Sequence, residues 1–333
     1  MKNGLVSVII VTLNNLEWLK KCLNALNDQE YKNIEVFVVD NGSSDNTVSY
    51  LKKHMPEIIC ITSGENIGFG RACNLALKKA NGEYVLIYND DAICEKDFIK
   101  KLVVRIKKEP LIGAIQGTLL FADRRNIIES AGAYLTPTGI LIKDFGGEFD
   151  EKLALEKEVF NANLPLIRMS VLKKVGFFDD DYFLYFEEAD LCWRIWLSGS
   201  KILYHPNAKI YHARGVTTKR LQAPVIVEST FRNRINSLIK NLEPGSLLKI
   251  LPFHLTICIG GMMAYILKGK PQGAMAILKA LIWNIKSINN TLKKRKIINR
   301  MRKRKDSELL PIIMRPMSAS YLMKTSLDYL RQW

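Results

Sequence analysis

The sequence predicts an α/β fold, in which a mostly parallel sheet carries helices on both faces, followed by a C-terminal helical region. Three observations predict it. Short runs of Val, Ile and Leu recur between Val6 and Tyr88, and such runs are typical of strands buried on both faces. Segments with helical spacing separate these runs. From Val225 onward the pattern of apolar residues is helical.

The spacing of apolar residues gives the elements in order. The expected strands are residues 6–11, 34–39, 58–62 and 84–88. The expected helices between them are residues 16–26, a helix capped by Asp45-Asn46-Thr47, and residues 69–80. Beyond residue 110, glycine and polar residues interrupt the alternation and predict longer loops. Periodicity returns near residues 156–175 and 187–196.

The charge of the chain restricts its partners. The chain has 333 residues and a net charge of +16, which favours acidic partners such as phosphates, anionic lipid or nucleic acid. Nine Lys or Arg and no acid lie between Lys293 and Lys305. The six cysteines show no CxxC spacing, and a strand is expected almost at the N-terminus, without a signal peptide. These features predict reduced thiols and a cytoplasmic location.

Two apolar stretches near the C-terminus allow two interpretations. Residues 247–267 are interrupted by Lys249, Pro252 and His254, and residues 274–285 are short, whereas a helix that spans a membrane needs about 20 apolar residues. They are either two core helices or a pair of helices lying in a membrane surface. In the second case the basic run lies beside anionic head groups.

Asn89-Asp90-Asp91 closes the apolar run 84–88. Carboxylates at the end of a buried strand are costly unless something neutralises them, and ligands bind at this end of an open α/β sheet. A divalent cation with oxygen ligands, itself carrying a diphosphate, accounts for this cluster.

Two further segments are candidates for nucleotide binding. Asp40 ends the second expected strand before a polar turn, where it either accepts a hydrogen bond from a ligand or caps the next helix. The segment from Glu65 to Asn74 holds Gly68, Gly70 and Arg71 ahead of a helix. Such a segment either binds phosphate or is an ordinary loop, since it has neither a P-loop nor a GxGxxG pattern.

A second acidic cluster, Glu187-Glu188-Ala189-Asp190, lies among aromatic residues. Apolar surroundings raise the pKa of a carboxyl and make it a better general base. The alternatives are a helix N-terminus that favours acids and a pair between Asp190 and Arg194. His212 ends a late expected strand and is either structural or a metal ligand.

In combination, these segments resemble the family 2 glycosyltransferases, inverting enzymes with a GT-A fold, and especially the bacterial rhamnosyltransferase-like members. The order of the motifs carries the resemblance over about residues 5–240. The matching segments are Val8 to Asn14, Val38 to Asp45, Asn66 to Phe69 with Asn74, Asn89-Asp90-Asp91, Gly176 to Asp179, Phe186 to Arg194, and His212.

The resemblance implies a role for each segment. Residues 1–240 would form the GT-A domain, with a nucleotide-sugar half at about 1–110 and an acceptor half at about 111–240, followed by a helical and basic region at 241–333. Asp91 and His212 would hold Mg²⁺ or Mn²⁺. Glu188 would be the base, with Glu187 and Asp190 holding the acceptor or orienting the base. The implied substrate-binding residues are Thr12, Asn14, Asp40, Asn66, Gly68, Arg71, Asn74, Asn89 and Asp90.

Two departures from the family pattern stand out. Asn89 replaces the more usual Asp, which makes Asp91 the expected direct metal ligand. Glu188 also replaces the more usual Asp, and the extra methylene moves the carboxylate by roughly 1 Å. Either Glu187 or Glu188 is therefore the base.

The expected activity is metal-dependent, inverting transfer of a sugar from dTDP-rhamnose or a UDP-hexose to a glycan, implied to be a polyprenyl-diphosphate-linked one at the inner membrane face. The alternatives are a nucleotidyltransferase acting on sugar phosphates, an inactive glycan-binding relative and a nucleic-acid-binding protein. Nucleic acid is disfavoured because the basic residues gather in one run rather than in a groove with aromatics. The sequence leaves the oligomeric state open.

Overall fold

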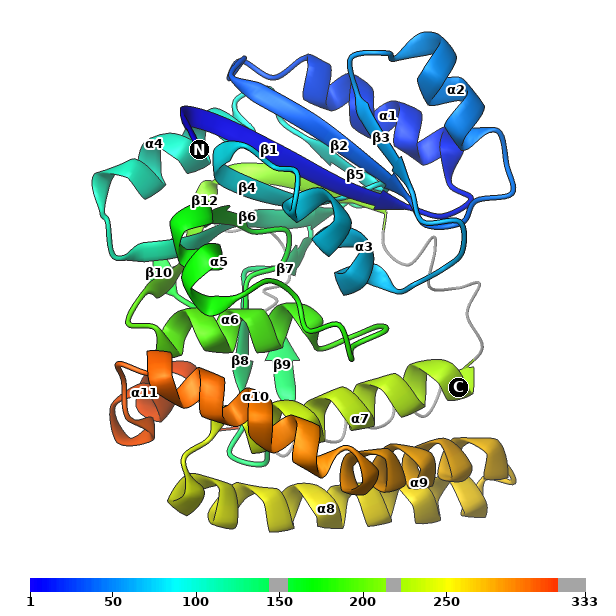
Figure 1. Ribbon diagram of the computed structural model, residues 1–333, viewed down its shortest axis with the longest axis vertical. Helices are drawn as coiled ribbons and strands as arrows, with labels where there is room; N and C mark the ends of the chain where they lie inside the picture. The colour runs from blue at the N-terminus through cyan, green and yellow to red at the C-terminus, as the bar shows by residue number, and fades with distance from the viewer. Residues whose placement is uncertain (144–154, 214–222, 317–333) are drawn as a thin grey trace.

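The computed structural model describes residues 1–143, 155–213 and 223–316. Within them the chain forms a ten-stranded sheet with the order β10-β12-β6-β11-β4-β1-β2-β3, with β5 on β12 and β7 on β6 (Figure 1). The strands are β1 (Lys2–Thr12), β2 (Ile34–Asp40), β3 (Ile59–Thr62), β4 (Gly82–Asn89), β5 (Ala92–Cys94), β6 (Ile112–Phe121), β7 (Ile128–Ser130), β10 (Lys157–Glu158), β11 (Leu166–Arg168) and β12 (Lys201–His212). A separate hairpin pairs β8 (Ala133–Leu135) with β9 (Leu141–Lys143).

The helices fall into two groups. Those among the strands are α1 (Leu16–Asn27), α2 (Thr47–His54), α3 (Phe69–Leu77), α4 (Phe98–Lys108), α5 (Met169–Val175) and α6 (Glu187–Leu197). Those that follow the last strand are α7 (Ala223–Asn241), α8 (Pro244–Leu267), α9 (Pro271–Lys286), α10 (Ile288–Met301) and α11 (Asp306–Ile313). The predicted α/β class with a helical C-terminal region is confirmed.

The sheet is more mixed than the sequence predicts. Strands β3, β2, β1 and β4 are parallel neighbours, and β6 and β12 are parallel to each other. The short strand β11 lies between β4 and β6 and is antiparallel to both. The alternation of strands and helices fixes the parallel order only where a helix crosses over between strands, and that pattern ends near residue 110.

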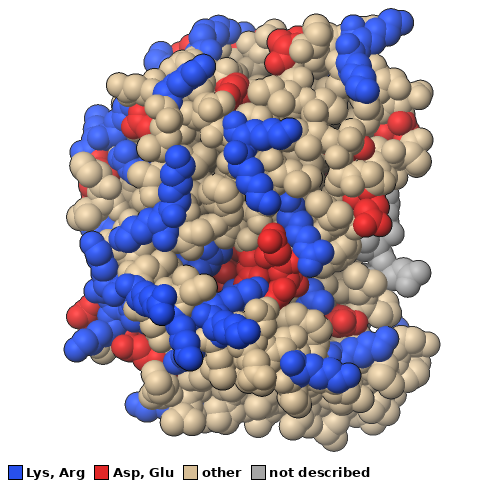
Figure 2. All heavy atoms as spheres, viewed as in Figure 1, with Lys and Arg blue, Asp and Glu red and all other residues tan. Residues whose placement is uncertain are grey.

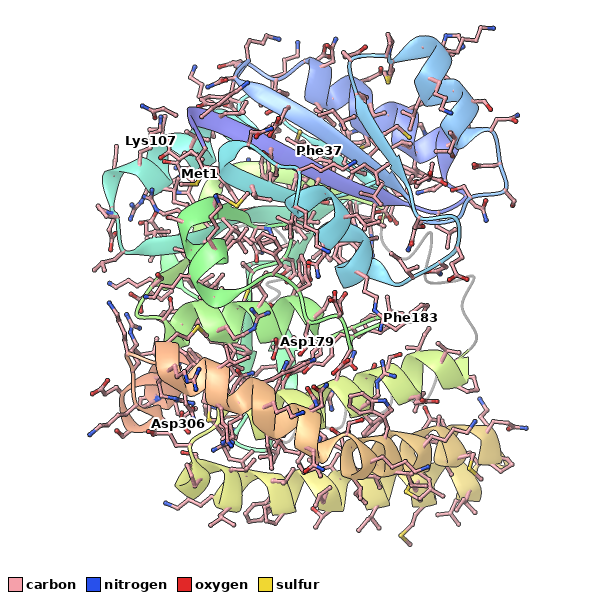
Figure 3. The ribbon with its side chains drawn as sticks, in the orientation of Figure 1. Met1, Phe37, Lys107, Asp179, Phe183 and Asp306 are labelled. Carbon is pink, nitrogen blue, oxygen red and sulfur yellow. The ribbon has the colours of Figure 1, made fainter. Side chains whose placement is uncertain are left out.

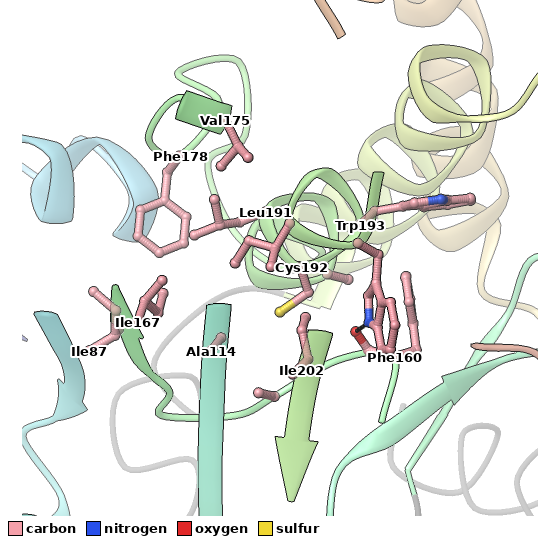
Figure 4. Close-up of a cluster of buried hydrophobic side chains, with 14 of the residues drawn as sticks. Ile87, Ala114, Phe160, Ile167, Val175, Phe178, Leu191, Cys192, Trp193 and Ile202 are labelled. Carbon is pink, nitrogen blue, oxygen red and sulfur yellow. Dashed lines mark hydrogen bonds between the residues drawn. The ribbon is translucent and has the colours of Figure 1, made fainter. Parts of the chain in front are cut away.

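Helices cover both faces of the sheet, as predicted. One buried cluster joins the sheet to α3, α5 and α6, and a second joins it to α1, α2 and α4. Figure 4 shows the first cluster, where Trp193 of α6 lies against Phe160 with the ring centroids 5.5 Å apart. Because α6 is buried along most of its length, its first turn is held firmly against the sheet.

The helix α8 is continuous through Lys249, Pro252 and His254, which interrupt the apolar run in the sequence. It runs for 24 residues, with a mean hydropathy of 1.8, and is long and apolar enough to cross a membrane. Pro252 removes one backbone hydrogen bond but lies on the exposed side. Ile250, His254 and Cys258 recur every four residues and are buried, so contacts along one side hold the helix in register.

The other sides of α8 and α9 are apolar and exposed. Both helices lie at the end of the molecule remote from β1, β2 and β3 (Figure 1), where Figure 2 shows a surface with few charged groups. The exposed fraction is 64% for Phe253, 59% for Met263 and 72% for Ile285. Neither helix contains an acid, and Pro244 to Lys305 holds fourteen Lys or Arg.

Candidate active site

The carboxyl ends of three parallel strands bring the first candidate residues together. Thr12 at the end of β1 pairs in register with Asp40 at the end of β2, and Val11 pairs with Asn89 at the end of β4. Because the strands are parallel, the polar residues that end them share one edge of the sheet. The fold therefore brings Thr12, Asp40 and Asn89 to one edge of the sheet.

Asp90 is buried between Thr12 and Asp91. The hydroxyl of Thr12 donates a hydrogen bond to Asp90 Oδ2 at 2.8 Å. Burial and the neighbouring carboxylate of Asp91 raise the pKa of Asp90 to about 7. A cation bound near this cluster would stabilise the ionised form of Asp90.

His212 lies between two carboxylates. Its Nε2 is 3.1 Å from Asp91 Oδ1 and 3.1 Å from Asn89 Nδ2, and its Nδ1 is 2.7 Å from Glu129 Oε2. Burial opposes a charge on the ring, but the hydrogen bonds to Asp91 and Glu129 outweigh it and raise the pKa of His212 to about 9. A buried imidazolium is thus held between two acids.

A divalent cation would take the place of the proton on Nε2, because a histidine that binds a metal is neutral. Metal-binding histidines commonly direct their second ring nitrogen at a carboxylate, which is the position of Glu129. Asp91 and the opposite ring nitrogen would then be the protein ligands. Within the described ranges no set of three or more His, Cys, Asp or Glu side chains is grouped to bind a metal.

Asp40 has an unsatisfied oxygen. It is 3% exposed, and its Oδ2 accepts a hydrogen bond from the backbone of Ser43 at 3.2 Å. Its Oδ1 is buried and has no hydrogen-bond partner among the residues that the structure describes. Since a buried acceptor without a partner is costly, Asp40 is suited to accept a hydrogen bond from a ligand.

Asn14 and Asn66 hold loops around this position. The side-chain oxygen of Asn14 accepts hydrogen bonds from the backbone of Ser44 at 2.7 Å and of Asp45 at 3.3 Å. The side-chain oxygen of Asn66 accepts one from the backbone of Gly68 at 3.1 Å and one from Asn41 Nδ2 at 3.0 Å. Asn14 and Asn66 therefore join the loops after β1 and β3 to the loop that follows β2.

Gly68 is required by a close contact between two segments. Its φ is +88°, and a Cβ there would lie 2.4 Å from the carbonyl oxygen of Phe183. The next amide, that of Phe69, donates a hydrogen bond to the same oxygen at 3.1 Å. The Gly68 segment thus lies directly against the loop that leads into α6, as the positions of α3 and Phe183 in Figure 3 illustrate.

Arg71 and Asn74 continue this contact. Arg71 Nε donates to the carbonyl of Asp180. Asn74 Nδ2 donates to the carbonyl of Phe178 at 2.9 Å and to Asp180 Oδ1 at 2.8 Å, and its Oδ1 accepts from the Phe178 amide at 3.1 Å. All described contacts of Asn74 are thus within the protein, and they tie α3 to the loop between α5 and α6.

Glu187 and Glu188 begin α6 beside α3. A Cβ on Gly70 would lie 3.8 Å from the Cβ of Glu187, so the first turns of α6 and α3 are neighbours. Because α3 begins just after β3, this position lies at the same edge of the sheet as Asp40. Burial and the charge of Glu188 raise the pKa of Glu187 to about 8, and Glu187 Oε2 has no protein partner.

Asp190 is enclosed by cations and amides. Arg194 Nε and Lys240 Nζ each lie 3.0 Å from one of its oxygens, and Asn241 Nδ2 donates to it at 2.9 Å. Burial alone would raise its pKa, but Lys240 and Arg194 lower it. Its side chain is 0% exposed. Its contacts with Lys240 and Asn241 join α6 to α7.

A second acid completes this ion network. Lys240 also contacts Asp179, and Lys294 of α10 bridges Asp179 and Asp181. Figure 3 labels Asp179 between α6 and α10, and Figure 2 shows acidic groups in a hollow on this face, surrounded by Lys and Arg. The C-terminal helices therefore hold the loop that reaches Gly68, and part of the basic run has this internal role.

Comparison with known proteins identifies the family. The sequence model of Glycosyl transferase family 2 matches residues 7–190, more than half of the chain. The chain belongs to this family. The resemblance to the family 2 glycosyltransferases is thereby confirmed, and the protein is a glycosyltransferase.

The relatives of this glycosyltransferase are distant. Poly-beta-1,6-N-acetyl-D-glucosamine synthase of Staphylococcus aureus strain COL is 24% identical over 207 residues, which cover 61% of this chain and 48% of the relative. The synthase of the same name from Staphylococcus epidermidis is 25% identical over the same length. The chain thus spans about half the length of these curated relatives.

Two solved structures confirm the GT-A fold of this glycosyltransferase. S. aureus TarS 1-349 in complex with UDP-GlcNAc aligns with a TM-score of 0.56 at 18% identity, covering 88% of this chain and 90% of that one. GalNAc-T7 with UDP, GalNAc and Mn²⁺ aligns with a TM-score of 0.59 at 16% identity, covering 71% and 48%.

The structure of the glycosyltransferase also reveals residues that the sequence does not single out. Glu129 lies behind His212, and Lys240 joins Asp179 to Asp190. Each is a lone charged residue within an apolar stretch, Ile127-Ile128-Glu129 and Leu238-Ile239-Lys240. A charge at an otherwise buried position is a signal for a buried partner, but the sequence does not identify that partner.

Proposed function

We propose that this glycosyltransferase moves a sugar from a nucleotide-diphosphate sugar to a hydroxyl of a glycan, with inversion at the anomeric carbon, in the synthesis of a cell-surface polysaccharide. One observation carries the proposal. The unsatisfied oxygen of Asp40, the Asp91–His212 pair and the Glu187-Glu188 cluster share the edge of the sheet that receives ligands in α/β folds.

The donor would lie across the strand ends. Asp40 would accept a hydrogen bond from the nucleobase, and the loops held by Asn14 and Asn66 would enclose the nucleotide. Thr12 and Asn89 would keep Asp90 and His212 in place beside the diphosphate. The relatives and the two structures described above carry names or ligands with GlcNAc or GalNAc, which favours a UDP-linked sugar over dTDP-rhamnose.

Asp91 and His212 would hold Mg²⁺ or Mn²⁺. When bound, the ion would neutralise charge on the departing diphosphate. Glu129 would keep the His212 ring oriented through its 2.7 Å contact with Nδ1. Arg71 lies beside the Gly68 segment and would add positive charge near the phosphates.

Glu188 would take the proton from the acceptor hydroxyl as that oxygen attacks the anomeric carbon from the face opposite the diphosphate. Glu188 is partly exposed, whereas Glu187 is buried and its pKa is raised to about 8. Accessibility therefore favours Glu188 as the base. Asp190, enclosed by Lys240 and Arg194, would hold α6 in place rather than touch the acceptor.

The test is a panel of nucleotide sugars with Mn²⁺ or Mg²⁺, scored by thermal shift and by slow hydrolysis. A ligand that binds only the folded state raises the apparent stability. Asp91→Ala should abolish transfer and weaken metal-dependent donor binding. Glu188→Gln should abolish transfer and spare that binding, while full turnover by Glu188→Gln would assign the base to Glu187.

We further propose that the protein binds peripherally to the inner face of the cell membrane, where the acceptor is a polyprenyl-diphosphate-linked glycan. Ile250, His254 and Cys258 attach one side of α8 to the protein, which favours a helix lying in the membrane surface over one that crosses it. The exposed apolar side and the lack of acids along α8 and α9 support this. Failure to float with anionic liposomes at low salt would exclude it.

A further inference from the structure

The turn that begins α6 is built from two left-handed residues. Tyr185 has a φ of +62° and Phe186 a φ of +69°. Residues other than glycine are strained in this region, so neighbouring groups must hold them there. Glu187 and Glu188 follow directly. The direction in which both carboxylates leave the backbone therefore depends on this turn.

Asn233, in the middle of α7, holds the turn. Its side-chain amide donates hydrogen bonds to the carbonyl of Leu184 at 2.9 Å and to the carbonyl of Tyr185 at 2.7 Å. Its Oδ1 accepts a hydrogen bond from Arg232 Nε at 3.1 Å. The residue is 0% exposed, so both bonds come from a side chain that is enclosed by the protein.

Further contacts fix α7, the element from which Asn233 approaches. The hydroxyl of Tyr182 lies 2.9 Å from Asn236 Oδ1 and 2.7 Å from Ser237 Oγ. Asn236 Nδ2 donates to Thr291 Oγ1 of α10 at 2.8 Å. The amide of Asn233 is thus attached to a helix that is held on two sides, and it acts as a fixed point for the turn.

We infer that Asn233 is a positioning residue for sugar transfer: it keeps the Tyr185–Phe186 turn left-handed and thereby aims Glu188 at the acceptor hydroxyl. The inference rests on the proposed function, in which Glu188 is the base. Without the amide, the carbonyls of Leu184 and Tyr185 lose their side-chain donor and the turn relaxes toward ordinary backbone angles. Glu188 then moves, while the donor-binding edge formed by β1, β2 and β4 is unchanged.

The test compares Asn233→Ala with the wild-type chain under donor saturation, well below the unfolding midpoint of each. A displacement of about 1 Å at a reacting group costs on the order of 100-fold in rate, so kcat should fall by roughly 30- to 100-fold. The KM for the donor and the thermal shift that the donor produces should stay unchanged. The matched control is Asn81→Ala, which removes an exposed amide that donates to the carbonyl of Lys79 at 3.2 Å and should leave kcat unchanged.

A second variant separates positioning from mere stabilisation. Glycine adopts a positive φ without strain, and Tyr185 is 37% exposed. Adding Tyr185→Gly to Asn233→Ala should therefore recover about tenfold of the lost kcat, whatever its effect on the unfolding midpoint.

The outcomes distinguish the two hypotheses. If Asn233→Ala lowers only the unfolding midpoint and keeps the wild-type kcat, or if the double variant is no faster than Asn233→Ala, the positioning role is wrong. If the wild-type chain transfers no sugar from any donor of the panel, the proposed function itself is wrong.

Discussion

At the scale of single residues, Glu129 has the most specific role to test. Its carboxylate lies 2.7 Å from Nδ1 of His212, on the side away from Asp91. Removing such a carboxylate behind a metal-binding histidine typically costs 10- to 100-fold in metal affinity. We expect Glu129→Gln to raise the Mn²⁺ concentration that gives half-maximal donor-induced thermal shift by about that factor.

The chain offers a matched control for Glu129. His205 Nδ1 lies 3.0 Å from Glu156 Oε2, a similar pair away from the strand ends. Glu156→Gln should therefore leave the Mn²⁺ titration unchanged. An equal weakening in both variants, or none in Glu129→Gln, would contradict a metal site at His212.

Glu187 predicts a dependence of stability on pH. Its pKa rises from an ordinary value of 4.5 to about 8 on folding. Between these values the unfolded chain releases the proton while the folded chain keeps it, so the wild-type fold loses stability as pH rises from about 4.5 to about 8. Glu187→Gln removes this loss.

Urea unfolding at pH 5 and pH 8 checks the prediction for Glu187. The stability of Glu187→Gln relative to wild type should increase between the two pH values by up to a few kcal/mol, on the order expected for a buried carboxyl. Glu17→Gln, at an exposed position with a side chain 79% exposed, is the control. A constant difference for Glu187→Gln would show that its carboxyl is already ionised in the fold at pH 5.

The residue types at the site are predictable from sequence, but their partners are not. The placement of Asp40, Asn89 and Asp91 follows from their positions after buried strands, because parallel strands end at one edge. The roles of Asn74 and Asp190 depend on contacts between segments about 50 to 100 residues apart, which no local pattern encodes. The structure therefore assigns Asn74 and Asp190 contacts within the protein.

At the scale of elements, the same limit explains which segments the sequence predicts well. The strands and helices of the first half are predicted by apolar periodicity, because each of them buries apolar side chains at a regular spacing. The short antiparallel strand β11 carries only three residues, too few for a period to be recognised. The continuity of α8 past Pro252 depends on its packing through Ile250 and His254, which sequence alone does not display.

Lys240 tests how much the contact between α6 and α7 stabilises the fold. It is 1% exposed and contacts both Asp179 and Asp190. Removing one partner of a buried ion pair leaves an uncompensated charge and typically costs 3–5 kcal/mol. We expect Lys240→Met to lower the free energy of unfolding by about this amount in urea. The control Lys53→Met, at an exposed position, should change it by less than about 0.5 kcal/mol.

At the scale of the whole molecule, the C-terminal helices connect two surfaces. α7 and α10 hold the loop with Asp179 and Asp181, which reaches the Gly68 segment at the donor edge. α9 packs on α7, and α8 lies beside them with its apolar side exposed. An acceptor held in a membrane beside α8 would thus lie next to the helices that hold the loop with Asp179 and Asp181.

The apolar side of α8 provides the last prediction. Phe253 and Met263 are 64% and 59% exposed, and each buried apolar side chain contributes about 1.5–3 kcal/mol on leaving water. The double variant Phe253→Ser/Met263→Ser should therefore lose at least tenfold in affinity for anionic vesicles, measured by flotation, while turnover of a soluble acceptor is kept.

The control for this prediction is Val104→Ser/Leu111→Ser, at positions 50% and 55% exposed away from these helices. It should bind vesicles as wild type does. Because salt screens only the basic residues, the defect of the α8 variant should persist at high salt. Equal binding by both double variants would mean that charge alone, without α8, attaches the protein to the membrane.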